Sequence, residues 1–298
     1  MITLKHILKE SLLFLLGRTC PRLQVSLLFR LTHGRWIDWK HPRDINEKVQ
    51  WLKFYGDTIL WSQLADKYAV REYIAEKGLE HILIPLIGKW DKAEEIDWDV
   101  LPQQFVMKAN HGCGDILICT NKTTIDTAYW TRQFSKLLKE KFGYRFGEPH
   151  YNKIKPCIIA EKLLDATKQP IPSSSLIDYK IWCFNGKPTY ITTYSNRTKE
   201  GLCDLNIYDT HWNQYPQFIR ANDHYLPGKQ SLPQPHNLCQ MLEIATILTK
   251  GFPCVRLDLY EVGGKVFFGE MTFTPSAGLN FTYTQEFLNI LGDLCKLQ

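Results

Sequence analysis

The segments RLDLY at residues 256–260 and FGEMT at residues 268–272 decide the fold of this chain. Polar and apolar residues alternate in them, which is typical of β-strands with one buried face, because successive side chains point to opposite sides. Two glycines lie between the segments, so we predict an antiparallel hairpin. Alternation predicts one face that carries Arg256 and Asp258 on the first strand, and one that carries Phe268, Glu270 and Thr272 on the second.

Asp258 and Glu270 are candidate metal ligands. Two carboxylates with few other protein ligands suit Mg²⁺, which keeps several waters and takes its remaining oxygens from phosphates. Thr272 would add a hydroxyl and Arg256 a positive charge to the same wall. The alternative is an exposed sheet face on which Arg256 simply pairs with one of the carboxylates, and the hairpin taken alone favours that interpretation.

The loop between the strands decides whether the two carboxylates meet. Directly opposed residues of an antiparallel pair lie on one face, and Asp258 is opposite Glu270 only if the pairing is centred on Gly264. A two-residue Gly263–Gly264 turn, the natural turn for this sequence, would instead place Asp258 opposite Gly269 and turn Glu270 to the other face. We predict an odd loop or an equivalent bulge, with both carboxylates within reach of one ion.

A glycine-bearing segment joins two further predicted strands, at residues 105–108 and 116–119. A lysine at a strand end, followed by such a turn, can present a positive charge and backbone N–H groups to phosphates. The segment lacks the Walker A pattern, so a plain hairpin turn is the alternative. The candidate phosphate-binding residues are Lys108, His111, Gly112 and Gly114.

The nine cysteines indicate free thiols in a reducing cytoplasm. Their number is odd and no pair has C-x-x-C spacing, which argues against a disulfide framework and a structural zinc site. Cys113 lies close to His111, but no third member of a catalytic group is evident. We therefore do not predict a cysteine nucleophile.

The composition excludes several other classes of protein. The 298 residues are 44% hydrophobic and 22% charged, as in globular proteins, and the net charge of +5 is dispersed along the chain. We predict no nucleic-acid partner, because no stripe of lysine and arginine is present. The apolar run at residues 12–16 is shorter than the roughly 20 residues of a membrane span, so at most a peripheral contact through an amphipathic N-terminal helix is expected.

The rest of the chain mixes helices and strands without strict alternation, so the predicted fold class is α+β. Asp44 and Glu47 have the spacing of a capping box and start a predicted helix that ends at Tyr55. Asn185-Gly186 is the strongest hairpin signal. Further predictions are helices at 61–77, 127–141, 238–248 and 286–296, strands at 156–161, 176–184, 188–194, 255–260 and 266–271, and a long loop at 196–235.

Taken in order, these segments resemble the ATP-grasp superfamily, and most closely the TupA-like ATP-grasp family associated with teichuronopeptide and other bacterial surface polysaccharides. The resemblance runs from residue 46 to residue 278. It is clearest at residues 66–71, 105–112, 178–180 and in the 256–273 hairpin. It implies antiparallel sheets flanked by helices, with the nucleotide held between two subdomains: a helical region at 1–65, a central subdomain at 66–160 and a C-terminal subdomain at 161–298.

The resemblance also implies roles for individual residues. Phosphate-binding positions match Lys67 and Lys108, and the glycine loop over the triphosphate matches His111, Gly112 and Gly114. The adenine hinge matches Glu161, Lys162 and Leu164, and a further nucleotide contact matches Lys180. Magnesium ligands match Asp258 and Glu270, and an arginine near the acyl phosphate matches Arg256. The superfamily usually has Asn where this chain has Thr272, a weaker magnesium ligand.

The activity implied by the resemblance is ATP- and Mg²⁺-dependent ligation of a carboxylate to an amine, in the cytoplasm or at the inner face of the membrane. The carboxylate would be a uronic acid or an amino acid, the amine a small amino compound, and the setting the synthesis of a capsule or another surface polysaccharide. One alternative is phosphoryl transfer to a sugar hydroxyl, and another is a non-catalytic polysaccharide-binding protein that uses the nine tryptophans. The oligomeric state is not predicted.

Overall fold

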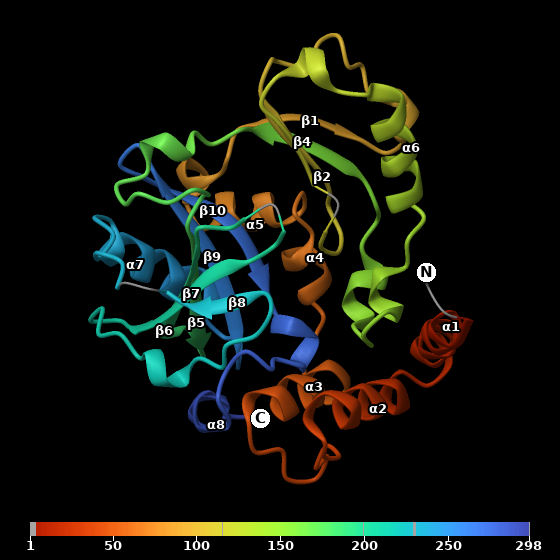
Figure 1. The fold of residues 1–298 in the computed structure, drawn as a ribbon, viewed down its shortest axis with the longest axis vertical. Helices are drawn as coiled ribbons and strands as arrows, with labels where there is room; N and C mark the ends of the chain where they lie inside the picture. Colours follow the sequence, from red (N-terminus) through yellow and green to blue (C-terminus); the bar gives the residue numbers. More distant parts are fainter. Residues whose placement is uncertain (1–3, 115, 199, 229–230, 298) are drawn as a thin grey trace.

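The computed structural model describes residues 4–114, 116–198, 200–228 and 231–297. Two separate β-sheets with helices around them confirm the α+β class (Figure 1). The smaller sheet is antiparallel, has the order β1-β4-β2-β3, and consists of β1 (Leu86–Trp90), β2 (Phe105–Ala109), β3 (Leu117–Cys119) and β4 (Ile158–Lys162).

The larger sheet has the order β10-β9-β5-β6-β7-β8 and is antiparallel except for the β7–β8 pair. Its strands are β5 (Asp178–Phe184), β6 (Lys187–Ser195), β7 (Cys203–Asp209), β8 (Tyr225–Pro227), β9 (Val255–Val262) and β10 (Lys265–Thr272). The strands β7 and β8 lie in the region predicted to be a long loop, so that prediction is wrong. Leu205 and Ile207 of β7 are fully buried, and the burial of these side chains outweighs the polar residues around them.

Helices cover the sheets and form the N-terminal end of the molecule. α6 (Thr127–Leu137) packs on the smaller sheet, whereas α7 (Leu238–Thr249) packs on the larger one. The helices α1 (Leu4–Thr19), α2 (Pro21–His33) and α3 (Ile45–Tyr55) lie together at the lower end in Figure 1. The others are α4 (Trp61–Ala65), α5 (Val70–Glu76) and α8 (Gln285–Leu294). In the described part of the chain, no helix has the length and apolarity needed to cross a bilayer.

The predicted helix at 61–77 is in fact two helices, and the break has a clear cause. Asp66 Oδ1 accepts hydrogen bonds from the backbone N–H groups of Tyr68 (2.8 Å) and Ala69 (3.1 Å), which competes with helical hydrogen bonding. Lys67 within the break donates its backbone N–H to the carbonyl oxygen of Asn110. The break therefore joins the helical region to the glycine-bearing segment.

The capping box predicts the start of α3 correctly, since Asp44 accepts a hydrogen bond from the backbone N–H of Glu47 (2.9 Å). The Asn185-Gly186 hairpin is likewise confirmed as the β5–β6 turn. The predicted subdomain boundary between residues 160 and 161 runs through β4, which belongs entirely to the smaller sheet. All nine cysteines are free, and six of them are buried.

The β9–β10 hairpin uses the two-residue turn and still brings the carboxylates together. Val262 pairs with Lys265 across the glycine turn, so the odd loop is wrong, but a bulge at Gly269 shifts the register and Glu270 pairs with Asp258. The predicted equivalent bulge is therefore confirmed. Phe268 pairs with Leu259 and faces the core, contrary to the prediction that it shares a face with Glu270, because the extra residue reverses the alternation.

Candidate functional site

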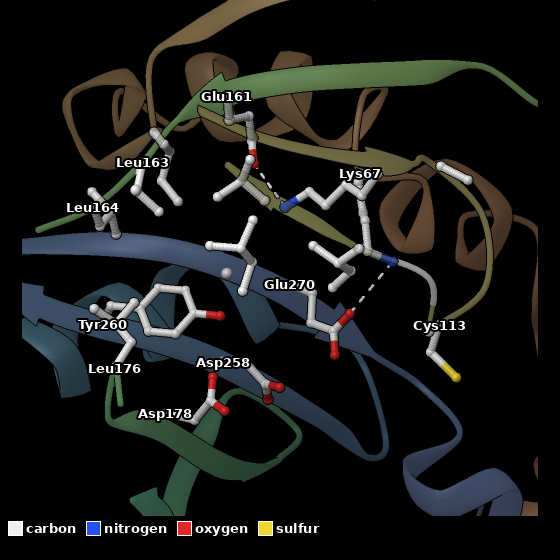
Figure 2. Close-up of a pocket in the computed structure, with 18 of the residues that line it drawn as sticks. Lys67, Cys113, Glu161, Leu163, Leu164, Leu176, Asp178, Asp258, Tyr260 and Glu270 are labelled. Carbon is white, nitrogen blue, oxygen red and sulfur yellow. Dashed lines mark ion pairs between the residues drawn. The ribbon is translucent and has the colours of Figure 1, made fainter. Parts of the chain in front are cut away.

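A cavity of about 680 Å³ lies between the two sheets, within the usual size range of small-molecule sites. Its walls come from the strands of both sheets, the 111–114 segment and the connection that follows β4 (Figure 2). The following predicted residues line it: Lys67, Lys108, His111, Gly112, Gly114, Glu161, Lys162, Leu164, Lys180, Asp258 and Glu270. Arg256 and Thr272 do not.

The smaller sheet contributes one carboxylate held between two cations. Lys108 in β2 and Glu161 in β4 form an ion pair of 2.7 Å, and Arg71 of α5 reaches the same carboxylate at 3.2 Å. Glu161 is almost entirely buried, so removal of either cation would leave a poorly compensated charge. Sequence reasoning assigned Glu161 to a hinge and missed Arg71, which has no local sequence signal.

The larger sheet contributes a second and denser charge network. Arg256 Nε and Nη2 each lie 2.8 Å from an oxygen of Asp258, and Lys180, which is opposite Asp258 on β5, binds the same carboxylate. Lys67 Nζ lies 3.7 Å from Glu270 Oε2 and donates a hydrogen bond to the carbonyl oxygen of Gly112 (2.8 Å). Three cations thus surround Asp258 and Glu270, and a third carboxylate, that of Asp178, lies 3.9 Å from Lys180, so the positive and negative charges of the network balance.

Glu270 is the more accessible of the two carboxylates, with a side chain that is 35% exposed against 2% for Asp258. Burial raises the pKa of Glu270, but the charges of Lys67, Lys180 and Arg256 outweigh it and bring the pKa to about 2. The group is therefore ionised at neutral pH. Burial also lowers the pKa of His111, which keeps that imidazole neutral.

The oxygen donors in this wall fit a divalent cation. Asp258 and Glu270 are directly opposed on neighbouring strands, and Thr272 Oγ1 lies 3.3 Å from Glu270 Oε1. Carboxylate and hydroxyl oxygens are ligands that Mg²⁺ accepts. Among the described residues, no three His, Cys, Asp or Glu side chains gather as a metal-binding group, so a cation here would need oxygens from its ligand as well.

The other end of the cavity is mainly apolar. Figure 2 shows Leu163, Leu164 and Leu176 at that end, away from Lys67, with the ring of Tyr260 beside them and its hydroxyl toward the charged end. Apolar walls of this kind suit a planar ring, and the backbone of the strand end supplies hydrogen-bonding groups beside them. The predictions missed Tyr260, although its position two residues after Asp258 on β9 places it on the same face.

Asp178 and Lys180 are largely buried residues of the cavity wall. Their side chains are 15% and 14% exposed, and both line the cavity. Lys180 was predicted from the resemblance alone, because the residues next to it in the sequence carry no signal of a buried site. The burial arises because β5 is an inner strand, which the local sequence does not reveal.

A second cavity of about 470 Å³ adjoins the first and is lined by Arg256 and Thr272. The two cavities meet beside Glu270, because both are lined by Gly112, Cys113, Phe142 and Glu270. The site thus divides into a large compartment with an apolar end and a smaller one that begins at the charged wall.

The profile of the TupA-like ATP-grasp family matches residues 47–296 of this chain. No curated protein matches the sequence.

Several solved ligase structures have a similar but distant fold. D-alanine–D-alanine ligase from Bacillus anthracis in complex with ATP is 12% identical, with a TM-score of 0.47, and the match covers 78% of this chain and 65% of that enzyme. The Helicobacter pylori ligase of the same name is 11% identical, with a TM-score of 0.43 and coverage of 85% and 67%. The ATP-grasp ligase PsnB is 10% identical, with a TM-score of 0.40 and coverage of 78% and 58%. The chain thus spans about two thirds of the length of these enzymes or less.

Proposed function

The chain belongs to the TupA-like ATP-grasp family, and we propose that it binds ATP with Mg²⁺ in the large cavity and uses it to join a carboxylate to an amine. The observation that carries this proposal is the arrangement of the cavity, which has an apolar end and a charged end. The charged end combines the ammonium groups of three lysines, which can contact phosphates, with two opposed carboxylates, which can hold a divalent cation.

Each part of the cavity would then have a distinct task. The adenine ring would lie against Leu164 and the strand end at Glu161 and Lys162, and the phosphates would contact Lys67, Lys108 and Lys180. The backbone N–H groups around His111, Gly112 and Gly114 would cover the phosphates. Mg²⁺, when bound by Asp258, Glu270 and Thr272, would neutralise phosphate charge.

The proposed chemistry balances in two steps. A substrate carboxylate oxygen attacks the γ-phosphorus, the bond to the β-phosphate oxygen breaks, and an acyl phosphate and ADP result. The amine nitrogen then attacks the carbonyl carbon, inorganic phosphate leaves and the nitrogen loses a proton, which gives an amide. Arg256 would stabilise the negative charge that develops on the acyl oxygens, because its guanidinium lines the second cavity beside Glu270.

We further propose, from the family's setting, that the carboxylate is a uronic acid or an amino acid and that the product belongs to a capsule or another surface polysaccharide. The reaction would take place in the cytoplasm, where ATP is available, with at most a peripheral membrane contact. Phosphoryl transfer to a sugar hydroxyl is the second candidate, because the same nucleotide site would serve it.

The reaction products test the proposal directly. With a panel of uronic and amino acids and a panel of amines, we expect ADP and inorganic phosphate, and hydroxylamine should trap the activated carboxylate as a hydroxamate. ADP release that requires only a sugar hydroxyl would favour phosphoryl transfer. AMP with pyrophosphate would contradict the ligase proposal.

Binding can be tested without a substrate. ATP with Mg²⁺ should raise the melting temperature of the protein, because a ligand that binds only the folded state adds about 2.7 kcal/mol of stability at a hundredfold excess over its Kd. EDTA should remove most of the rise. A well-folded protein whose melting temperature does not respond to saturating ATP and Mg²⁺ would contradict the nucleotide proposal.

The lysine assigned to the phosphates provides a matched pair of variants. Lys108→Ala should lower turnover by roughly 10²–10³, the usual cost of removing one group that stabilises developing charge. Lys155→Ala is the control, since the side chain of Lys155 is 80% exposed and, among the residues that the structure describes, pairs with Asp91 alone. Near-full activity of Lys108→Ala would show that the phosphate assignment is wrong.

A further inference from the structure

The second cavity is built largely from parts of the chain that the charge network does not use. Leu28 and Thr32 of α2 form one wall, and residues of the 142–151 segment and the 272–281 segment form the others. The helix α2 precedes the region that matches the family, which begins at residue 47. The cavity therefore joins a helix outside the matched region to the charged wall at Glu270.

Glu148 is the unexpected residue in this cavity. The residue is 4% exposed, and one carboxylate oxygen, Oε1, accepts a hydrogen bond from Thr274 Oγ1 at 2.5 Å. Within the described residues, Oε2 accepts no hydrogen bond and forms no ion pair. Burial raises the pKa of this carboxyl group, and a cationic ligand at its free oxygen would compensate the charge of the ionised form.

The positive charge of Lys53 acts on Glu148, but its ammonium group forms hydrogen bonds with other residues. Its ammonium group donates hydrogen bonds to the carbonyl oxygens of Ala277 (2.7 Å) and Phe146 (3.2 Å) and is not paired with Glu148 within 4 Å. Burial lowers the pKa of Lys53 to about 8, although the negative charge of Glu148 acts in the other direction. Lys53 thus moderates the charge of Glu148 without occupying its free oxygen.

The remaining walls fit an apolar body with a positive charge. Phe142, Phe146, Tyr151 and Phe281 line the cavity, and aromatic rings attract ammonium groups as well as apolar groups. Phe142 packs so tightly against the glycine turn that a Cβ at Gly112 would come within 2.6 Å of its ring. The aromatic wall is therefore held next to the place where the two cavities meet.

We propose that the second cavity binds the amine substrate, a primary amine with an aliphatic or aromatic body, and that Glu148 binds its ammonium group. This inference rests on the proposed ligase function and adds the class of its second substrate. The amine would lie beside Arg256 and Glu270, where the acyl phosphate would form, while its body occupies the space between α2 and the aromatic wall. Because an ammonium nitrogen has no lone pair, it would transfer one proton to the Glu148 carboxylate before it attacks the carbonyl carbon.

Calorimetry on the full chain, with a non-hydrolysable ATP analogue and Mg²⁺, tests the inference without turnover. Phenethylamine should bind at least tenfold more tightly than phenethyl alcohol, its uncharged analogue, and Glu148→Gln should remove that difference. Equal binding of the two compounds, or unchanged selectivity in Glu148→Gln, would overturn the proposal. Failure of ADP formation with every substrate would instead count against the ligase function, so the two failures are distinguishable.

Two further variants keep the test decisive if Glu148→Gln fails to fold. Lys53→Met combined with Glu148→Gln removes both buried charges together and should also abolish the preference for the amine. Leu28→Trp should fill the cavity from α2 and weaken phenethylamine binding at least tenfold, whereas Leu31→Trp, at a position that is 64% exposed on the same helix, should not. Equal binding by the two tryptophan variants would contradict the placement of the amine.

Discussion

Two neighbouring hairpins of the larger sheet, β5–β6 and β9–β10, have similar backbone features, but these features affect the functional site differently. Both have two-residue turns, and both contain one shift of register. In β5–β6 the shift lies beside the turn, between Trp182 and Cys183, whereas in β9–β10 it lies at Gly269, next to the charged wall. The position of the bulge decides whether it affects only local pairing or the placement of a functional side chain.

The bulge at Gly269 lets one strand serve two purposes. Before it, Val266 and Phe268 are buried, and after it Met271 and Phe273 are buried, so the apolar positions change from even to odd numbers. With regular alternation, Phe268 and Glu270 would share a face, so Glu270 would point into the core with Phe268 or Phe268 would point into the cavity with Glu270. The extra residue removes this conflict, because it places Glu270 opposite Asp258 while both apolar pairs stay inside.

The largest effect should come from Glu270, which follows the bulge. Glu270→Gln should lower ADP formation by about 10³, because it removes a negative charge from the wall that would hold the metal and its phosphates. Steady-state measurement of ADP release at saturating ATP and Mg²⁺ checks this. Turnover within a few-fold of that of the unmodified protein would contradict the view that the bulge in β9–β10 places a functional side chain.

The glycine of the bulge should come second. A Cβ at position 269 would lie 2.9 Å from the carbonyl oxygen of Asp258 and 3.1 Å from the ring of Tyr260, so Gly269→Ala should displace the strand. We expect a loss of roughly 1–3 kcal/mol in stability and a fall of about 10–10² in turnover through misplacement of Glu270.

Gly264→Ala in the turn of the same hairpin is the matched control. Its φ is +73°, but the space around it is open, so a strain of about 1 kcal/mol is expected with unchanged turnover of the folded enzyme. Denaturant unfolding and ADP release measured on both variants make the comparison. Equal turnover in the two would show that the bulge does not position the site.

A third test uses the other glutamate of the hairpin, which has a structural role. Glu261 Oε1 accepts hydrogen bonds from the backbone N–H of Asn237 (3.0 Å) and from its side chain (2.6 Å), at the start of α7. Glu261→Ala should cost about 1–3 kcal/mol of stability, because two donors lose their partner. Melting curves should show the loss, while ADP release per folded molecule should not change.

The smallest effect should come from the turn of the other hairpin. Asn185 has a φ of +51°, a conformation that Asn tolerates better than Ala, so Asn185→Ala should cost up to about 1 kcal/mol. Unfolding in denaturant measures this loss. A change in the Kd of ATP would contradict the view that the β5–β6 turn is remote from the site.

The sequence determined the elements whose signals are local. The Asp44 cap, the two glycine-containing turns and most of the strands follow from the chemistry of a few adjacent residues, and the ordered segments pointed to the family. The apolar positions at 266, 268, 271 and 273 even contain the signal for the bulge. An edge of the larger sheet was missed at β7 and β8, although each of these strands pairs with the strand directly before it along the chain.

Tertiary structure alone decided how the charges are paired and which residues share a compartment. Lys67 meets Glu270, and Arg71 joins Lys108 at Glu161, only because the two sheets and the break after α4 bring them together. Glu148 has no local pattern at all, since its surroundings come from α2, α3 and the segment after β10. Propensity and alternation depend on near neighbours along the chain, whereas burial and ion pairing depend on packing between distant segments, which no local pattern encodes.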